Sequence, residues 1–310
     1  MAGTVVAACG AAQACQFAAV THASALPAPA AATMVLLCIV WGLNMVAMKI
    51  GIEGISPALQ GAWRSAGAAA LGLLWCLARG VPLAPMLGAT LWPGVLAGVV
   101  FGLEFSAVFI GAGLTTASRA VLFLYAAPFF VAVGAHLFVP GDRITPRALL
   151  GLVVAFIGLV LGLADGREGS LTGDLLCLVG AAGWACTTIL IKATRLRHAP
   201  AEYAMMYQLV VSVPVMLAIS ALLAEPGVFA PTPLVWASMA YQTVVVAFAS
   251  YIAWFWLVKR HAASRLAAFS FLTPLFGAAF GWALLGDVLG PMFLVALALV
   301  SVGILLVNAR

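Results

Sequence analysis

One unit of apolar sequence occurs twice in this chain, in divergent copies about 145 residues apart. Each copy carries the same anchors in the same order: a Ser-Arg pair, a proline inside an apolar run, a Gly-Asp pair and a second proline. The anchors are Ser118-Arg119, Pro128, Gly141-Asp142 and Pro146 in the first copy, and Ser264-Arg265, Pro274, Gly286-Asp287 and Pro291 in the second. A long internal period in a membrane chain is typical of transporters built from duplicated halves, with the solute handled between them.

The composition places the chain in a membrane. Of its 310 residues 65% are hydrophobic and 7% are charged, and the mean hydropathy is +1.18. This is too little polar surface to cover a water-soluble globule, and the apolar runs reach the roughly 20 residues that span a bilayer. The sequence therefore predicts an all-α membrane protein with many membrane crossings.

Hydropathy predicts ten transmembrane helices, five in each copy. The predicted spans are 33–51, 57–78, 90–111, 118–138, 147–163, 173–193, 201–223, 234–257, 265–285 and 291–308. An odd number of spans makes the second copy enter the membrane from the opposite face, so the two five-helix repeats are inverted. Residues 1–32 lack Lys and Arg and include Pro27 and Pro29, so we expect a disordered N-terminal tail there, with a signal peptide as the alternative. The first repeat is expected over 33–165 and the second over 171–310.

Basic residues predict the orientation, because Lys and Arg in short loops resist translocation. Ten of them fall on the side shared by both termini, and three fall on the other side, namely Lys49, Arg119 and Arg167. Both termini are therefore expected in the cytoplasm. The net charge of +5 needs no nucleic-acid partner, since topology and anionic membrane lipids account for it.

A further pair of anchors points to a family. Trp41 and Lys49 stand eight residues apart, as do Trp184 and Lys192. With the anchors above, this pattern resembles the EamA-type transporters of the drug/metabolite transporter superfamily, and within it bacterial exporters of aromatic amino acids. The resemblance implies a central cavity lined by the first four helices of each repeat, alternating access, outward movement of small organic solutes and a bacterial inner-membrane location.

The fifth and tenth spans carry almost no hydrogen-bonding side chains, which favours a peripheral position facing lipid or a partner. The fifth span contains a GxxxG step at Gly158 and Gly162, which allows close approach of another helix. That helix belongs either to a second copy or to the same chain. We expect a monomer or a weak homodimer.

Two charges are predicted at membrane depth, where an ion is costly unless it is paired or faces water. Arg64 lies seven residues beyond Pro57, and Glu104 lies about seven before the end of its span, so both sit roughly 10 Å below the outer surface. They are interpreted either as a salt bridge between two helices or as groups that bind a zwitterionic solute or couple a proton.

Other candidates are polar or aromatic groups inside apolar runs. Asn44 follows Trp41 by three residues on one helix face, and Thr187 stands in the matching region beside Trp184. An apolar pocket of aromatic rings with a few hydroxyl and amide groups at its wall suits an aromatic solute. These remaining candidates are Tyr125, Tyr207, Gln208, Gln242 and Tyr251. Ordinary helix packing is the alternative interpretation for each of them.

Pro128 and Pro274 occupy equivalent positions and are predicted to kink their helices. We interpret them as hinges, with purely structural bending as the alternative.

The chain shows no HExxH, GxSxG or P-loop motif, and its six cysteines show no CxxC spacing. We expect no catalytic residue, no metal site and no cofactor. The predicted function is export of small organic metabolites, amino acids in particular and aromatic ones by preference. The alternatives are export or import of other metabolites or drugs, and a channel-like facilitator. The expected partners are a small-molecule substrate and membrane lipids.

Overall fold

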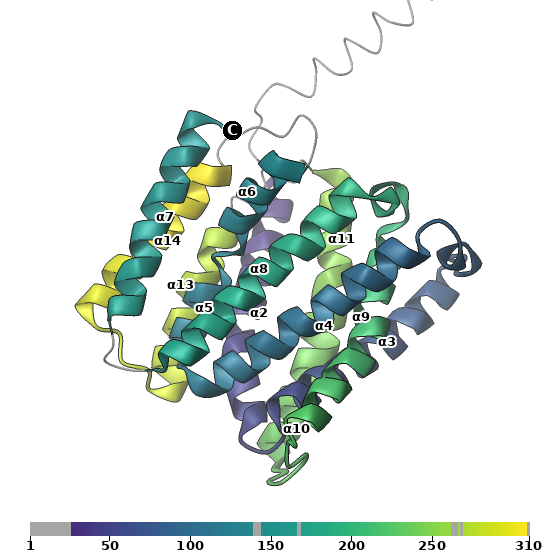
Figure 1. Ribbon diagram of the computed structural model, residues 1–310, viewed down its shortest axis with the longest axis horizontal. Helices are drawn as coiled ribbons and strands as arrows, with labels where there is room; N and C mark the ends of the chain where they lie inside the picture. The colour runs from purple at the N-terminus through teal and green to yellow at the C-terminus, as the bar shows by residue number, and fades with distance from the viewer. Residues whose placement is uncertain (1–25, 139–143, 166–168, 262–265, 267–268, 309–310) are drawn as a thin grey trace, which may run out of the picture.

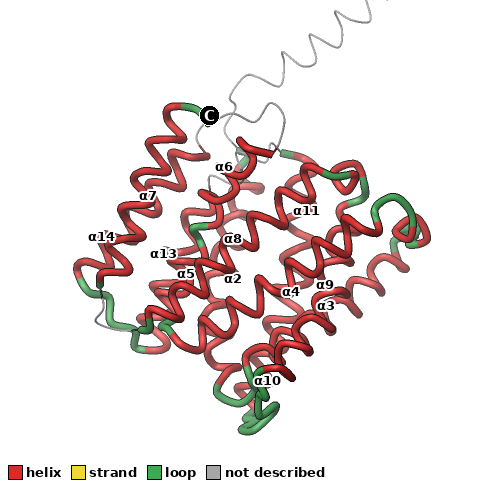
Figure 2. The backbone as a smooth tube through the Cα atoms, in the orientation of Figure 1, coloured by secondary structure: helices red, strands yellow, loops and turns green. Residues whose placement is uncertain are grey.

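The described chain is helical throughout. The computed structural model describes residues 26–138, 144–165, 169–261, 266 and 269–308, and Figure 1 and Figure 2 show these as a bundle of helices joined by short loops. Within these ranges the extended pairing is one isolated bridge between Ile55 and Val228. Several residues named above lie outside the described ones: Gly141, Asp142, Arg167, Ser264 and Arg265, together with residues 1–25 of the expected tail.

A helical segment lies in each of the ten predicted ranges. The first half contains α2 (Ala28–Ile52), α3 (Pro57–Ala78), the short η1 (Ala84–Leu87), α4 (Leu91–Leu114), α5 (Ala117–Leu124), α6 (Ala127–Phe138) and α7 (Pro146–Ala164). The second half contains α8 (Leu171–Ala193), η2 (Arg195–His198), α9 (Ala201–Leu222), α10 (Pro233–Ala240), the π-helical η3 (Tyr241–Ser250), α11 (Tyr251–Arg260), η4 (Phe269–Phe271), α13 (Leu272–Phe280), the π-helical η5 (Gly281–Leu285) and α14 (Pro291–Asn308).

Seven helical segments among the described residues are long and apolar enough to cross a membrane. Two shorter apolar helices, Phe269–Leu285 and Pro291–Val307, accompany them. α3 is not among the seven, and it carries the buried polar residues Gln60, Arg64 and Ser65. An all-helical chain with this many apolar helices is a multi-pass membrane protein, because a helix satisfies its own backbone hydrogen bonds in lipid.

The first helix begins earlier than its predicted start at residue 33. α2 starts at Ala28, with Pro27 as its N-cap and Pro29 in the first turn. A proline is favoured in that turn, because its missing N–H has no acceptor there and its fixed φ suits a helix. The two prolines therefore open the helix, whereas the sequence interpretation had taken them as a sign of a disordered tail.

The prolines predicted as hinges lie at helix starts and not inside continuous helices. The fourth span is divided between α5 and α6, and Pro128 is the second residue of α6. In the ninth span Pro274 is the third residue of α13, directly after the 3-10 turn η4. The break follows from the proline ring, which removes one backbone donor and clashes with the preceding turn. Both repeat-related prolines thus mark interrupted helices, and their role as hinges remains a prediction.

α7 and α14 form a pair at one edge of the bundle, where Figure 1 shows them side by side. Their glycines allow this contact. A Cβ added at Gly158 would lie 2.9 Å from the carbonyl oxygen of Ala296, and one added at Gly303 would lie 2.8 Å from that of Gly151. A Cβ added at Gly162 would lie 3.0 Å from the side chain of Leu122 on α5. The glycines of the fifth span are therefore used for packing within the chain.

Candidate functional site

Arg64 is a charged group in the apolar interior. It lies on α3 and is 1% exposed. Its guanidinium carbon stands 4.0 Å from the ring centre of Phe105 and 5.4 Å from that of Phe109, both on α4. The Nε and Nη2 atoms have no hydrogen-bond partner among the described residues. The ring faces stabilise the cation but offer it no acceptor, so its N–H groups keep their capacity to bind an anion.

Glu104 is the second buried charge, 5% exposed on α4. Its Oε2 accepts a hydrogen bond from Thr187 Oγ1 of α8 at 3.4 Å, a long distance for such a bond. α8 approaches this closely because Gly183 faces the glutamate, where an added Cβ would lie 2.8 Å from Glu104 Cβ. The structure thus brings together Glu104 and Thr187, which the sequence had proposed separately.

The interpretation of Arg64 and Glu104 as a salt bridge is wrong. Among the described residues the only ion pair joins Arg119 and Asp174. Arg64 and Glu104 influence each other electrostatically without direct contact. Equal depth in the membrane does not bring side chains together, because helix rotation directs Arg64 onto the rings of α4 and Glu104 towards α8.

The tryptophans of the repeated motif contact other aromatic rings. Trp41 donates from Nε1 to Ser250 Oγ at 2.9 Å, and its ring meets that of Trp254 edge to face with 5.9 Å between centres. Trp184 meets Tyr125 in the same manner at 5.8 Å. The structure therefore places both motif tryptophans in edge-to-face pairs, each of which joins one repeat to the other.

Asn44 has an unused acceptor in the interior. Its Nδ2 donates to Met48 Sδ at 3.3 Å on the same helix, whereas Oδ1 has no partner in the described part of the chain. The side chain is 5% exposed. A buried amide oxygen of this kind is suited to accept a hydrogen bond from a solute or a water molecule.

Tyr207 lies away from Glu104. Its hydroxyl donates to the carbonyl of Met86 and lies 3.2 Å from Thr90 Oγ1, in the loop before α4. Its ring contacts α4 at Gly94, ten residues and so about 15 Å along the helix from Glu104. Gln208 is half-buried on α9. The contacts of Tyr207 are those of a residue that fixes a loop.

Tyr251 lies nearer to the buried charges. It is half-buried, packs against a cluster that includes Ala68 and Met205, and is within electrostatic reach of Arg64.

A buried amide pair joins three helices and was not predicted as a unit. Gln60 Nε2 donates to Gln242 Oε1 at 3.1 Å and to the carbonyl of Met48 at 3.3 Å, while Gln242 Nε2 donates to the carbonyl of Ala47 at 3.2 Å. Both glutamines are fully buried. Gln242 had been grouped with the aromatic candidates, but its amide is used to connect α2, α3 and η3.

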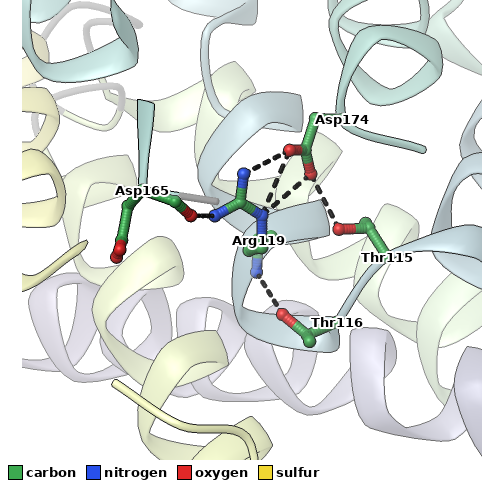
Figure 3. Close-up of polar contacts among 5 residues, drawn as sticks. All are labelled: Thr115, Thr116, Arg119, Asp165 and Asp174. Atoms are coloured by element: carbon green, nitrogen blue, oxygen red, sulfur yellow. Dashed lines mark hydrogen bonds and ion pairs between the residues drawn. The ribbon is translucent and has the colours of Figure 1, made fainter. Parts of the chain in front are cut away.

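A denser polar cluster ties one end of the bundle together (Figure 3). Arg119 of α5 bonds both carboxylate oxygens of Asp174 on α8, and its Nη1 donates to the Asp165 carbonyl at 2.6 Å. Thr115 Oγ1 donates to Asp174 Oδ1 at 2.7 Å, and Lys49 Nζ donates to the Thr115 carbonyl at 2.7 Å. Asp174 was missed by the sequence interpretation, although an acid inside an apolar span is itself a signal.

The duplicated anchors meet across the two repeats. Asp287 Oδ2 accepts from the backbone N–H of Ser118 at 2.7 Å and from its hydroxyl at 2.6 Å. Ser118 lies in the first turn of α5, where a carboxylate satisfies a free N–H and interacts favourably with the helix dipole. The second repeat thus adds a carboxylate to the start of a helix of the first repeat, next to the N-cap residue Thr116. Within the described residues no three of His, Cys, Asp and Glu converge on one point.

This fold and its buried charged centre define a polytopic membrane transporter. The model of the EamA-like transporter family matches residues 28–163 and again residues 171–309, and the chain belongs to this family. It is therefore a membrane transporter of small metabolites, and not an enzyme.

Relatives of this chain include transporters from bacteria and archaea. A probable amino-acid metabolite efflux pump of Salmonella typhimurium is 30% identical over 282 residues, 87% of this chain and 91% of that protein. A protein of the same name in Escherichia coli is 27% identical over 282 residues, 87% of this chain and 91% of that protein. An uncharacterized transporter of Archaeoglobus fulgidus is 24% identical over 262 residues, 82% of this chain and 88% of its own.

A protein of known crystal structure shares the fold. It superposes with a TM-score of 0.65 over 91% of this chain and 97% of its own, at 21% sequence identity.

Proposed function

We propose that this chain is a carrier that exports amino acids, aromatic ones by preference, from the cytoplasm by alternating access. The names of the two efflux-pump relatives support the solute class and the direction. The aromatic preference is supported by the rings of Phe105 and Phe109, which lie at Arg64, and by Tyr251, which is within electrostatic reach of it. The edge-to-face pair of Tyr125 and Trp184 adds two further rings in the bundle.

The proposed architecture is ten membrane spans in two inverted five-helix repeats of a bacterial inner-membrane protein, with both termini in the cytoplasm. The packing of the helices supports it, because contacts occur in related pairs. α2 packs on α13 as α8 packs on α5 and α6, and α4 packs on α9 as η3 packs on α3. α7 with α14 and α3 with α9 are contacts between equivalent helices. A two-fold axis in the membrane plane relates such pairs.

The observation that carries the proposal is that two buried, oppositely charged groups face α4 and α8 without pairing. The Nε and Nη2 atoms of Arg64 have no hydrogen-bond partner among the described residues, and Glu104 is buried within electrostatic reach of it. An α-amino acid presents a carboxylate and an ammonium group a short distance apart. The carboxylate binds Arg64 through charge-assisted hydrogen bonds, and the ammonium binds Glu104 next to Thr187. Each buried charge then gains an oppositely charged partner that the protein does not supply. These two ion pairs offset the desolvation of the protein groups and of the solute.

Transport into proteoliposomes tests this function with three solutes that differ only in charged groups: L-phenylalanine, phenethylamine and 3-phenylpropionate. We expect saturable counter-transport of L-phenylalanine. Arg64→Gln is expected to lower kcat/KM for L-phenylalanine about tenfold to a hundredfold, the effect of losing about 1.5–3 kcal/mol of bonding to a charge. It should affect phenethylamine far less, because that solute has no carboxylate.

The matched control is Arg195→Gln, which removes an exposed arginine in η2. Unchanged discrimination between the three solutes in Arg64→Gln would exclude the zwitterion site. Unsaturable flux without counter-transport, together with single-channel currents, would favour the channel-like alternative.

A further inference from the structure

A pocket that is separate from Arg64 and Glu104 lies at the end of α3 opposite Pro57, between the ends of three helices. Its volume is about 330 Å³, at the lower end of the range for small-molecule sites. Trp75 and Arg79 line it from the end of α3, Glu202 and Met205 from the start of α9, and Trp256 with Arg260 from the end of α11. The pocket is thus formed by helices of both repeats.

Both arginines of this pocket lie over indole rings. The guanidinium carbon of Arg260 stands 4.4 Å from the ring centre of Trp256, and that of Arg79 stands 5.3 Å from the ring centre of Trp75. Both arginines are exposed. Stacking on a ring orients a guanidinium while its N–H groups at the edge remain available for a carboxylate or a phosphate. The tryptophans offer an apolar surface beside those groups.

The pocket combines both signs of charge with an apolar wall. Glu202 lies in the first turn of α9 and faces the same pocket as the two arginines. Met205 is buried at the wall and also belongs to the cluster against which Tyr251 packs. Tyr251 in turn is within electrostatic reach of Arg64. The pocket therefore borders the part of the interior that contains Arg64 and Glu104, the central charges.

We propose that this pocket is a second amino-acid site, at which a cytoplasmic solute binds before it reaches Arg64. The carboxylate binds Arg79 and Arg260, the ammonium binds Glu202, and an aromatic side chain packs on Trp75 and Trp256. The inference rests on the proposed function for the solute and for the cytoplasmic side. It adds a site with its own residues, about 16 Å along α3 from Arg64, since Trp75 is eleven residues further on.

A phospholipid phosphate shares the chemistry of the carboxylate. Basic pockets between membrane helices also bind anionic headgroups at the cytoplasmic surface. Glu202 favours the zwitterion, because a carboxylate in the pocket is unfavourable for an anionic lipid and favourable for an ammonium group. The experiment must therefore also measure whether an anionic lipid binds to the pocket.

The test is equilibrium binding of L-phenylalanine to the full chain in nanodiscs of phosphatidylcholine. We expect two molecules per chain in the unmodified protein and one in Arg79→Gln/Arg260→Gln. We also expect one molecule in Arg64→Gln and none when all three arginines are replaced. In transport from the cytoplasmic side, Arg79→Gln/Arg260→Gln, the pocket variant, should raise KM about tenfold with little change in the maximal rate.

Arg195→Gln/Arg197→Gln is the matched control, because it removes two exposed arginines from η2, next to the start of α9. Glu202→Gln gives a second readout, a smaller preference for L-phenylalanine over 3-phenylpropionate in the pocket.

Each outcome separates the two proposals. One molecule per chain that is lost in Arg64→Gln and kept in Arg79→Gln/Arg260→Gln overturns the second site and leaves the central site intact. One molecule that is lost in the pocket variant alone overturns the central site.

In the lipid arm, phosphatidylglycerol is added to the nanodiscs and bound lipid is counted by native mass spectrometry. Retention of phosphatidylglycerol that depends on Arg79 and Arg260, with amino-acid binding unchanged in the pocket variant, assigns the pocket to lipid and overturns the proposal.

Discussion

Removal of the Asp174 carboxylate should destabilise the fold more than any single change at the central charges. Asp174 is fully buried and accepts hydrogen bonds from Arg119 and from the Thr115 hydroxyl. Asp174→Ala leaves the Arg119 side chain, which is 5% exposed, without its carboxylate; among the described residues the Asp165 carbonyl and the nearby Phe123 ring remain as contacts. Breaking one side of a buried pair costs about 3–5 kcal/mol, because an uncompensated charge remains in a medium of low polarity.

The measurement is thermal unfolding of the purified protein in detergent. A loss of this size corresponds to a fall in Tm of roughly 10 °C. The double variant Arg119→Met/Asp174→Leu should recover most of that stability, since it leaves no buried charge behind. The coupling energy of this double-mutant cycle should exceed that of a cycle on Arg64 and Glu104, which make no direct contact.

A single variant Asp174→Ala that melts within about 2 °C of the unmodified protein would refute the reasoning, because that change corresponds to less than about 1 kcal/mol. So would a double variant that is no more stable than the single one.

Three further outcomes are expected. Gly158→Leu should lower stability by about 1–3 kcal/mol in the same melting assay, because α14 already fills the space at this position; an unchanged Tm would contradict the close packing. Pro128→Ala and Pro274→Ala should change the maximal transport rate more than KM, since they alter the helix breaks and not the binding groups; unchanged turnover in both would remove the hinge role. In a cysteine-free background, Leu87→Cys should react with an impermeant thiol reagent only from the cytoplasm and Phe229→Cys only from outside, both positions being exposed; labelling from one side alone would contradict the inverted topology.

The sequence alone was enough to define the class of protein. Long apolar runs are a local property of the chain, and in lipid a helix is the structure that satisfies the backbone of a single segment. The duplicated anchors, read in order, were also sufficient to indicate the family. Pro128 and Pro274 showed where two helices would be interrupted, because the effect of proline depends on its immediate neighbours in sequence.

The contacts between helices depended on the tertiary structure. Arg119 and Asp174 are 55 residues apart, Ser118 and Asp287 are 169 apart, and Glu104 and Thr187 are 83 apart. Spacing along one helix fixes the depth of a side chain in the membrane, but not the direction in which it points across the bundle. That direction is set by the rotation and crossing of packed helices, which depend on small residues such as Gly183 on the facing helix. For this reason Arg64 and Glu104 shared a predicted depth but formed no pair, while the buried pair that does form was visible only in three dimensions.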